Sequence, residues 1–184
     1  MSTPRRLRRR RSKFINEQRH KAACGPIAIA NAIKWLGVET SYRKVLDFCI
    51  EVRAYHRHIG MYSYQMRYVL RTLQVPFKVR RKMTVEGLDK IIDGGGAVIL
   101  AYQSQTKAKD GTISEGGHVV FINGRSVDGY LSWNKTKGLP PWFEREAMRK
   151  ALARSEAHET GLYVYVFPPH TPVEKDTVPK DSST

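Results

Sequence analysis

Cysteine and long apolar runs are scarce in this chain, and each scarcity excludes a class of protein. The 184 residues contain two cysteines, Cys24 and Cys49, in no dense pattern, so a disulfide-stabilised secreted domain is not expected. No hydrophobic run follows the charged N-terminus or is long enough to cross a membrane, so we expect neither a signal peptide nor a membrane span. These absences predict a protein that is made and kept in the reducing cytoplasm.

Acidic residues are also few, and the excess of positive charge is uneven. The chain has 17 Asp and Glu against 32 Lys and Arg, and residues 1–21 contain nine of these bases with Glu17 as the single acid. The Arg-rich segment 1–13 cannot bury itself, so it is predicted to be a disordered arm that binds nucleic acid or an acidic protein, or a solvated tail without a specific partner. The proline-rich polar segment 168–184 is predicted to be a disordered tail, which leaves residues 14–167 as one folded domain.

The middle of the chain changes from helical to strand periodicity. Helices are predicted over 26–35, after Thr40 or Ser41, after Ser63, after Thr84 and over 143–154. Strands are predicted over 97–103, 118–123, 129–133 and 162–167, with a polar loop at 104–117. Helices followed by strands predict an α+β fold in which an N-terminal helical half packs on an antiparallel sheet.

One cysteine stands where a nucleophile would be activated. Cys24 opens the apolar helical run that begins Cys24-Gly25-Pro26, and His118 begins a predicted strand after Gly116-Gly117. A helix N-terminus and an imidazolium both stabilise a thiolate. If the helix and the sheet face each other, Cys24 is positioned to attack a carbonyl while His118 transfers the proton.

Two further polar residues complete this candidate site. Asn134 lies just beyond the strand that pairs with the His118 strand and is predicted to orient the imidazole, although it would also suit a simple turn. Asp128 is the rival for this role, but its Asp-Gly context favours a hairpin turn. Gln18, six residues before Cys24, is the candidate side-chain donor to an oxyanion, alongside the Cys24 main-chain N–H.

These residues resemble the papain-like cysteine peptidases. The resemblance is strongest to the compact group that includes the peptidase domains of bacteriocin-exporting ABC transporters, which process double-glycine leaders, and their stand-alone relatives. It depends on Gln18, on Cys24-Gly25-Pro26, on the strand Gly117-His118-Val119-Val120, and on the sixteen residues from His118 to Asn134. It covers about residues 15–135, and it implies a peptidase fold and a protein or peptide substrate without a cofactor.

The chain departs from that group in two ways. The transporter-linked peptidases usually have Asp where this chain has Asn134, and an Asn orients an imidazole without adding negative charge. No transporter membrane or ATP-binding segment follows the domain in this sequence. Leader processing therefore does not transfer automatically from the resemblance, and the substrate stays open.

Other motifs favour simpler interpretations. Cys49 falls on the apolar face of its predicted helix and is interpreted as a core residue. His56 and His58 lack the additional Cys, Asp or Glu ligands of a zinc site, so no metal is expected. Gly94-Gly95-Gly96 precedes a strand and not a helix, which excludes a phosphate-binding loop.

Three function hypotheses follow. The favoured one is a cysteine peptidase or isopeptidase that acts through a Cys24 thioester. The second is another acyl-transfer enzyme on the same scaffold, such as an amidase or transpeptidase. The third is a catalytically silent binding protein for nucleic acid or an acidic partner. For that protein, tyrosines near two arginines provide either base-stacking groups or helix packing: Tyr62, Tyr64, Tyr68, Arg67 and Arg71.

Overall fold

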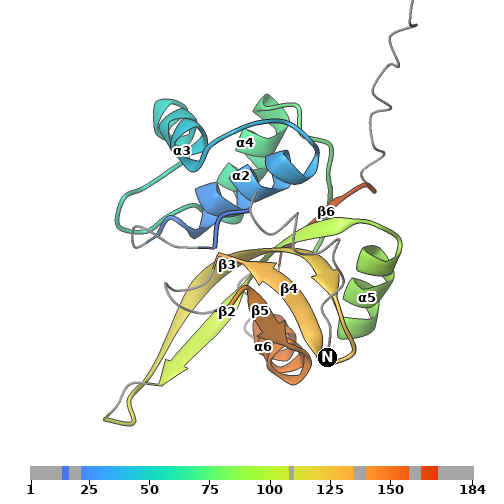
Figure 1. Cartoon of the computed structure of the whole chain (residues 1–184). Coiled ribbons are helices and arrows are strands. Elements are labelled where there is room, and N and C mark those ends of the chain that lie inside the picture. The colour runs from blue at the N-terminus through green and yellow to red at the C-terminus, as the bar shows by residue number, and fades with distance from the viewer. Residues whose placement is uncertain (1–13, 17–21, 108–109, 135–139, 158–162, 170–184) are drawn as a thin grey trace, which may run out of the picture.

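A six-stranded sheet in the order β1-β6-β2-β3-β4-β5 runs through the middle of the computed structural model, and all of its pairings are antiparallel (Figure 1). The structure describes residues 14–16, 22–107, 110–134, 140–157 and 163–169. The strands are β1 (Lys78–Arg80), β2 (Ala97–Lys107), β3 (Ile113–Arg125), β4 (Gly129–Trp133), β5 (Trp142–Glu144) and β6 (Tyr163–Phe167).

Three helices cover one face of this sheet: α2 (Cys24–Trp35), α3 (Tyr42–Glu51) and α4 (Ser63–Thr72) (Figure 1). α2 packs against β2, β3 and α3, which is why it is apolar nearly all round. Pro26 is tolerated in its first turn, and Gly37 adopts a φ of 89° just after its end. α3 begins where the Ser41 hydroxyl accepts a hydrogen bond from the Lys44 N–H over 3.2 Å.

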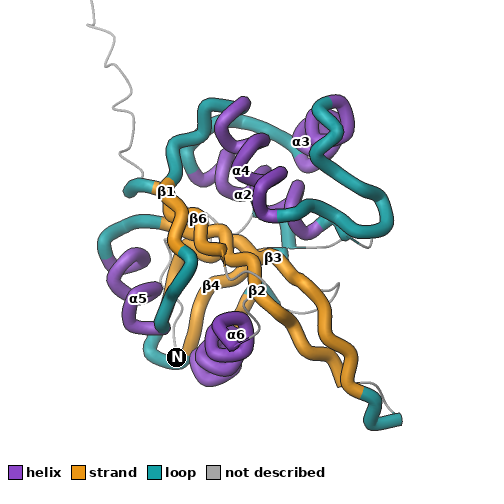
Figure 2. The backbone as a smooth tube through the Cα atoms, turned by 180° about the vertical axis from the view of Figure 1, so that it is seen from behind, coloured by secondary structure: helices purple, strands orange, loops and turns teal. Residues whose placement is uncertain are grey.

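Two helices cover the opposite face: α5 (Val85–Asp93) and α6 (Arg145–Ala157). Thr84 caps α5 by accepting a hydrogen bond from the Gly87 N–H over 3.1 Å. Figure 2 shows the sheet between the two helical layers. Each layer has its own hydrophobic core, because successive strand residues point to opposite faces. Thus Ile99 and Phe121 contact the α2 side, whereas Leu100 and Ile122 contact the α5 and α6 side.

The predicted α+β architecture with a helical half on an antiparallel sheet is confirmed, but the prediction for the segment 104–117 is wrong. The segment 104–117, expected to be a polar loop, extends β2 and β3 as far as the Lys107–Ile113 pair. Its pairs include Ser104 with Gly116, and the hydrogen bonds of such a ladder come from the main chain, so they need no apolar side chains. Figures 1 and 2 show this two-stranded arm projecting beyond both helical layers.

The structure does not describe the basic N-terminal segment 1–13, which is predicted to be disordered, or residues 170–184 of the predicted tail. The boundaries of both segments stay predictions. Across the described ranges, no helix has both the length and the apolar character that spanning a membrane requires.

Candidate active site

Cys24 is the first residue of α2, and the approach to it is conformationally unusual. Ala22, two residues earlier, adopts a left-handed φ of 71°, which is uncommon outside glycine. Ala23 is the N-cap and offers no side-chain hydrogen bond to the first turn. The N–H groups of that turn are therefore not capped by the residue that usually does so, and the positive end of the helix dipole lies at the thiol.

The Cys24 sulfur lies half-buried against the edge of β3. Burial raises the pKa of the Cys24 thiol, while hydrogen bonds from the main-chain N–H groups of Val119, Gly25 and Cys24 itself act in the opposite direction. Burial is the largest cause, so the net effect is a raised pKa, which favours the protonated thiol. This differs from the stabilised thiolate that the helix N-terminus led us to expect.

Two glycines allow the loop before α4 to lie close to the Cys24 turn. A Cβ atom added to Gly25 would lie 3.0 Å from the sulfur of Met61. A Cβ atom added to Gly60, whose φ is 92°, would lie 2.9 Å from the main-chain oxygen of Ala22. Larger residues at either position would push the loop before α4 and the Cys24 turn apart.

His118 lies on β3, opposite Tyr102 of β2 in the strand register. The two rings meet edge to face, with centroids 5.8 Å apart. Burial and the neighbouring Cys24 raise the pKa of Tyr102, so this phenol stays neutral. Tyr102 was not singled out from the sequence, because only the register of the two strands places it beside His118.

The His118 ring makes its hydrogen bond to main chain. Its Nε2 lies 3.1 Å from the main-chain carbonyl oxygen of Asn134. A carbonyl only accepts hydrogen bonds, so Nε2 carries the proton and the lone pair of the neutral ring is on Nδ1. In this tautomer Nδ1 is the basic nitrogen of the ring.

Asn134 uses its side chain for a different purpose. The fully buried amide Nδ2 donates to the main-chain oxygen of Cys24 over 2.9 Å and to that of Val119 over 2.7 Å. It thereby joins the start of α2 to the strand that carries His118. The amide oxygen Oδ1 has no hydrogen-bond partner among the described residues. Asn134 has a φ of 90°, a left-handed conformation that Asn tolerates better than most residues.

The strand pairing explains why Val119 is available for these contacts. β4 pairs with β3 only as far as the Phe121–Trp133 pair, so the main chain of Val119 lies beyond the end of that ladder. Its N–H meets the Cys24 sulfur and its carbonyl meets Asn134. The part of β3 that β4 does not pair with therefore contacts Cys24.

Comparisons with known proteins agree with this arrangement at the level of the fold. No protein-family model matches the chain, and a search of curated proteins also returns no match. Among solved structures, a C39-like peptidase from Bacillus anthracis is similar with a TM-score of 0.60 and 11% identity, covering 86% of this chain and 95% of that one. The peptidase domain of Streptococcus ComA, a bifunctional ABC transporter involved in a quorum-sensing pathway, is similar with a TM-score of 0.55 and 13% identity, covering 85% of this chain and 98% of that one.

This chain has a C39-like, papain-like cysteine peptidase fold. The resemblance inferred from the residues around Cys24 and His118 is thereby confirmed for the fold. At 11% and 13% identity, the comparisons carry no residue roles.

Within this C39-like fold, three of the four predicted site residues are described, and hydrogen bonds of Asn134 link them. Cys24 and Asn134 are joined directly, and Asn134 is joined to His118. Gln18 lies outside the described residues, so its role stays a prediction. Asp128 is at the opposite end of β4, where its carbonyl accepts a hydrogen bond from the Arg145 N–H, so it shapes the hairpin and does not orient His118.

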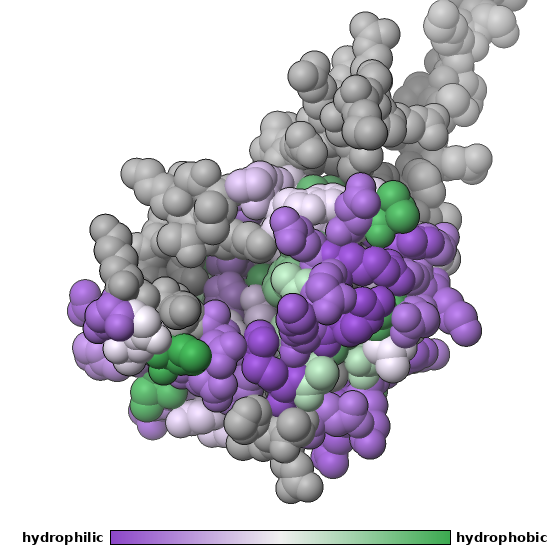
Figure 3. All heavy atoms as spheres, turned by 90° about the horizontal axis from the view of Figure 1, so that it is seen from below, coloured by the Kyte–Doolittle hydropathy of each residue, from purple (hydrophilic) through white to green (hydrophobic). Residues whose placement is uncertain are grey.

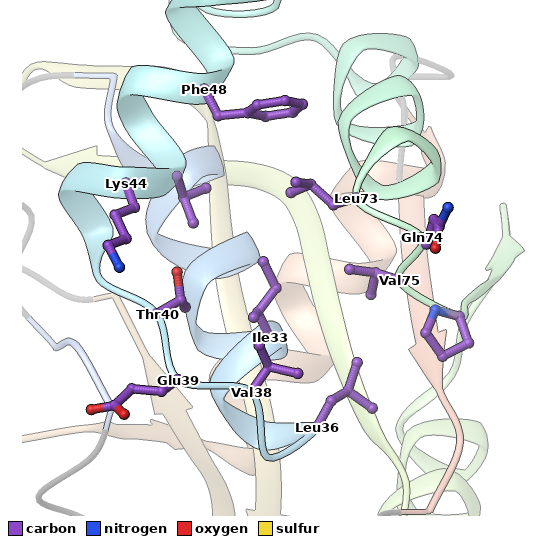
Figure 4. Close-up of a pocket in the computed structure, with 12 residues that line it drawn as sticks. Ile33, Leu36, Val38, Glu39, Thr40, Lys44, Phe48, Leu73, Gln74 and Val75 are labelled. Atoms are coloured by element: carbon purple, nitrogen blue, oxygen red, sulfur yellow. The ribbon is translucent and has the colours of Figure 1, made fainter.

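An apolar pocket of this protein lies away from Cys24 and His118. It has a volume of about 600 Å³ and is lined by the C-terminal end of α2, by α3 and by the segment after α4 (Figure 4). Ile33 and Leu36 line it, whereas Cys24 is at the other end of the same helix. It contains no thiol or imidazole, so we place the candidate active site at Cys24.

The described His, Cys, Asp and Glu side chains do not indicate a metal centre. In the part of the chain that the structure describes, no group of three or more His, Cys, Asp or Glu side chains is arranged to hold a metal ion. His56 faces Gly60 across an isolated β-bridge, which gives its segment a structural role next to the Cys24 turn.

Proposed function

We propose that this protein is a cysteine peptidase that hydrolyses peptide or isopeptide bonds through a thioester on Cys24. The observation that carries the proposal is the pair of hydrogen bonds from Asn134 Nδ2, which hold the Cys24 turn and the strand of His118 together. The tautomer of His118 and the C39-like fold support the same reaction.

The reaction begins with proton transfer. Because burial raises the pKa of the Cys24 thiol, His118 Nδ1 takes the sulfur proton as the sulfur attacks the substrate carbonyl carbon. The carbonyl oxygen becomes an oxyanion beside the N-terminus of α2. The Cys24 main-chain N–H and the side-chain amide of Gln18 are the proposed donors to it.

Collapse of this intermediate breaks the carbon–nitrogen bond. The leaving amine takes the proton from His118, and the acyl group stays on the sulfur as a thioester. His118 Nδ1 then takes a proton from a water molecule that attacks the thioester, and returns it to the leaving sulfur. The products are a carboxylic acid, an amine and the original thiol.

A peptide library tests this proposal across a wide range of candidate substrates. Wild-type protein and the Cys24→Ala, His118→Ala and Cys49→Ala variants are incubated with peptides from a digested proteome, and new termini are identified by mass spectrometry. The core cysteine variant is the matched control. We expect the same new termini from wild type and Cys49→Ala, with a decrease of at least about 10³-fold in the other two.

Two results would overturn the proposal. One is cleavage by Cys24→Ala at the wild-type rate. The other is a wild-type protein that produces no new termini and whose Cys24 alkylates no faster than Cys49, as a catalytically silent scaffold would behave.

A further inference from the structure

One segment of the chain, residues 52–85, carries side-chain charges of one sign. Residues 52–85 contain eight Lys or Arg and no Asp or Glu. All of them are exposed except Arg67, which is half-buried. Among the described residues, Lys82 is the member of this set that pairs with a carboxylate, that of Glu156 at 3.0 Å. The remaining charges are not neutralised by the fold and create a strongly positive surface.

The outward face of α4 combines this charge with aromatic rings. Tyr64, Arg67, Tyr68 and Arg71 are spaced at i, i+3, i+4 and i+7, so they share one face of the helix. Tyr64 is 68% exposed and Tyr68 is 52% exposed. The apolar side of α4 is buried against the core, so packing does not explain the exposed tyrosines.

A third tyrosine extends this surface at the start of the helix. Tyr62 is 49% exposed, and its ring is nearly parallel to that of Tyr64, with an interplanar angle of 8° and centroids 5.9 Å apart. Both tyrosines are exposed at the surface. Exposed aromatic rings are the groups on which unpaired bases stack.

Two adjoining grooves continue the surface from α4 across the edge of the sheet. The first, about 590 Å³, is lined by Arg67, Arg71 and Phe77 among others, and the second, about 490 Å³, by Lys78, Arg80 and Lys90. Both grooves include Phe77, and neither is lined by an acidic side chain. Figure 2 shows how α4 leads into β1, the edge strand of the sheet.

We propose that α4 and these two grooves form a binding surface for single-stranded nucleic acid. The arginines and lysines pair with phosphates, and the exposed tyrosines stack on bases without selecting a sequence. An acidic peptide would satisfy the charges but has no bases for the tyrosines, so the aromatic component favours nucleic acid. The inference concerns a surface separate from Cys24 and does not depend on peptidase activity.

The opposite face supplies a control. Figure 3 views the molecule from the side of α6, where hydrophilic side chains cover most of the surface. There Arg149 and Lys150 both lie near Glu146, so their charges are partly compensated. Removing these two charges changes the net charge as much as removing two from α4.

Fluorescence anisotropy of the full chain with two labelled strands tests the proposal. One strand is an oligothymidine of about 12 nucleotides, and the other is an abasic strand with the same number of phosphates. The variants are Tyr64→Ser/Tyr68→Ser, Arg67→Gln/Arg71→Gln and the control Arg149→Gln/Lys150→Gln. All of them keep residues 1–13, so any contribution of that basic segment is constant, and circular dichroism checks that each is folded.

We expect wild type to bind oligothymidine at least about fivefold more tightly than the abasic strand, because stacking adds to the phosphate contacts. Tyr64→Ser/Tyr68→Ser should remove that preference. Arg67→Gln/Arg71→Gln should weaken both strands and reduce the slope of log K against log salt by about 1.4, or 0.7 for each phosphate that is no longer paired. The α6 control should change neither quantity.

The proposal would be overturned by any of three results. Wild type binding both strands equally would exclude stacking, and a control variant that weakens binding as much as Arg67→Gln/Arg71→Gln would assign it to net charge. Polyglutamate that displaces the oligothymidine at an equal concentration of charges would show that the surface binds acidic proteins instead.

Discussion

His118 donates a hydrogen bond from Nε2 to the main-chain oxygen of Asn134, and the side chain of Asn134 points its amide elsewhere, to Cys24 and Val119. Residue 134 thus binds the imidazole through its backbone carbonyl and the start of α2 through its side chain. The two roles can be separated by substitution, because every residue type retains the carbonyl.

Asn134→Gly and Asn134→Asp should differ in a direction that identifies the amide as a donor. Glycine keeps the carbonyl and tolerates the φ of 90°, so it loses only the two amide hydrogen bonds, at about 1–3 kcal/mol of unfolding free energy. Aspartate places a carboxylate against two carbonyl oxygens, so it should be less stable than glycine at pH 7. Urea unfolding measures both.

An aspartate variant as stable as wild type, with peptide cleavage retained, would contradict this role. That result would mean that residue 134 orients His118 through its side chain, as the resemblance to transporter-linked peptidases suggested. Cleavage measured from pH 5 to 9 gives a second readout, since an added carboxylate beside His118 would move the acidic limb of the profile, whereas a purely structural change would not.

The two thiols should alkylate at very different rates in the native protein. Burial raises the pKa of Cys49 to about 12 and also raises that of Cys24, which keeps main-chain N–H groups at its sulfur. Iodoacetamide should therefore label Cys24 faster than Cys49. The labelling rate of Cys24 should still increase with pH when the pH exceeds the ordinary thiol pKa of about 8.5. Peptide mass spectrometry after timed labelling reads the two sites separately.

Linkage fixes the sign of the accompanying change in stability. The folded pKa of Cys49 lies above its unfolded value, so the folded protein holds a proton that the unfolded chain releases. The Cys49 thiol's contribution to stability is complete below the unfolded pKa and is lost as the pH rises toward about 12.

A labelling rate for Cys24 that reaches its plateau below about pH 7 would contradict the labelling prediction and would indicate a preformed thiolate–imidazolium pair.

Gly60→Ala should disturb the Cys24 turn more than its backbone angle alone requires. The new Cβ would lie 2.9 Å from the Ala22 oxygen, and the φ of 92° is itself strained for alanine, so we expect a loss of about 2 kcal/mol or more. Gly111→Ala is the matched control, because its φ is 86° but nothing lies within 4 Å of the added atom. Thermal unfolding and Cys24 labelling are measured for both variants, and equal losses of stability would mean that Gly60 makes no critical contact with Ala22.

Local rules predicted the helical half of the fold and the place of Cys24 at the start of an apolar helix. Pro26 lies in the first turn of α2 and Gly37 just after its end, and Ser41 and Thr84 cap the helices that they were expected to cap. Ser63 is instead the first residue of α4, where the Tyr62 N–H bonds to Gln65 over 2.8 Å. These features depend on residues within one turn of each other, which is why the sequence reveals them.

The paired arm and the function of the Asn134 side chain could not be predicted in the same way. The arm at 104–117 depends on main-chain pairing between polar segments, for which side-chain periodicity carries no signal. Asn134 acts on residues 15 and 110 positions away, and its amide orientation follows from where β4 stops pairing with β3. Such contacts depend on register, which the sequence pattern specifies only when one face of the strand is buried.

The hydrogen bond between Asn134 and the carbonyl of Cys24 also has a consequence for folding during synthesis on the ribosome. Its partners are 110 residues apart, so a growing chain that has already exposed the thiol still lacks the strands that complete the site. Domains generally fold as units, and contacts this distant in sequence form late. The proposed active site can therefore be assembled only after the C-terminal strands have been made, and a half-made chain carries the Cys24 thiol without His118 and Asn134.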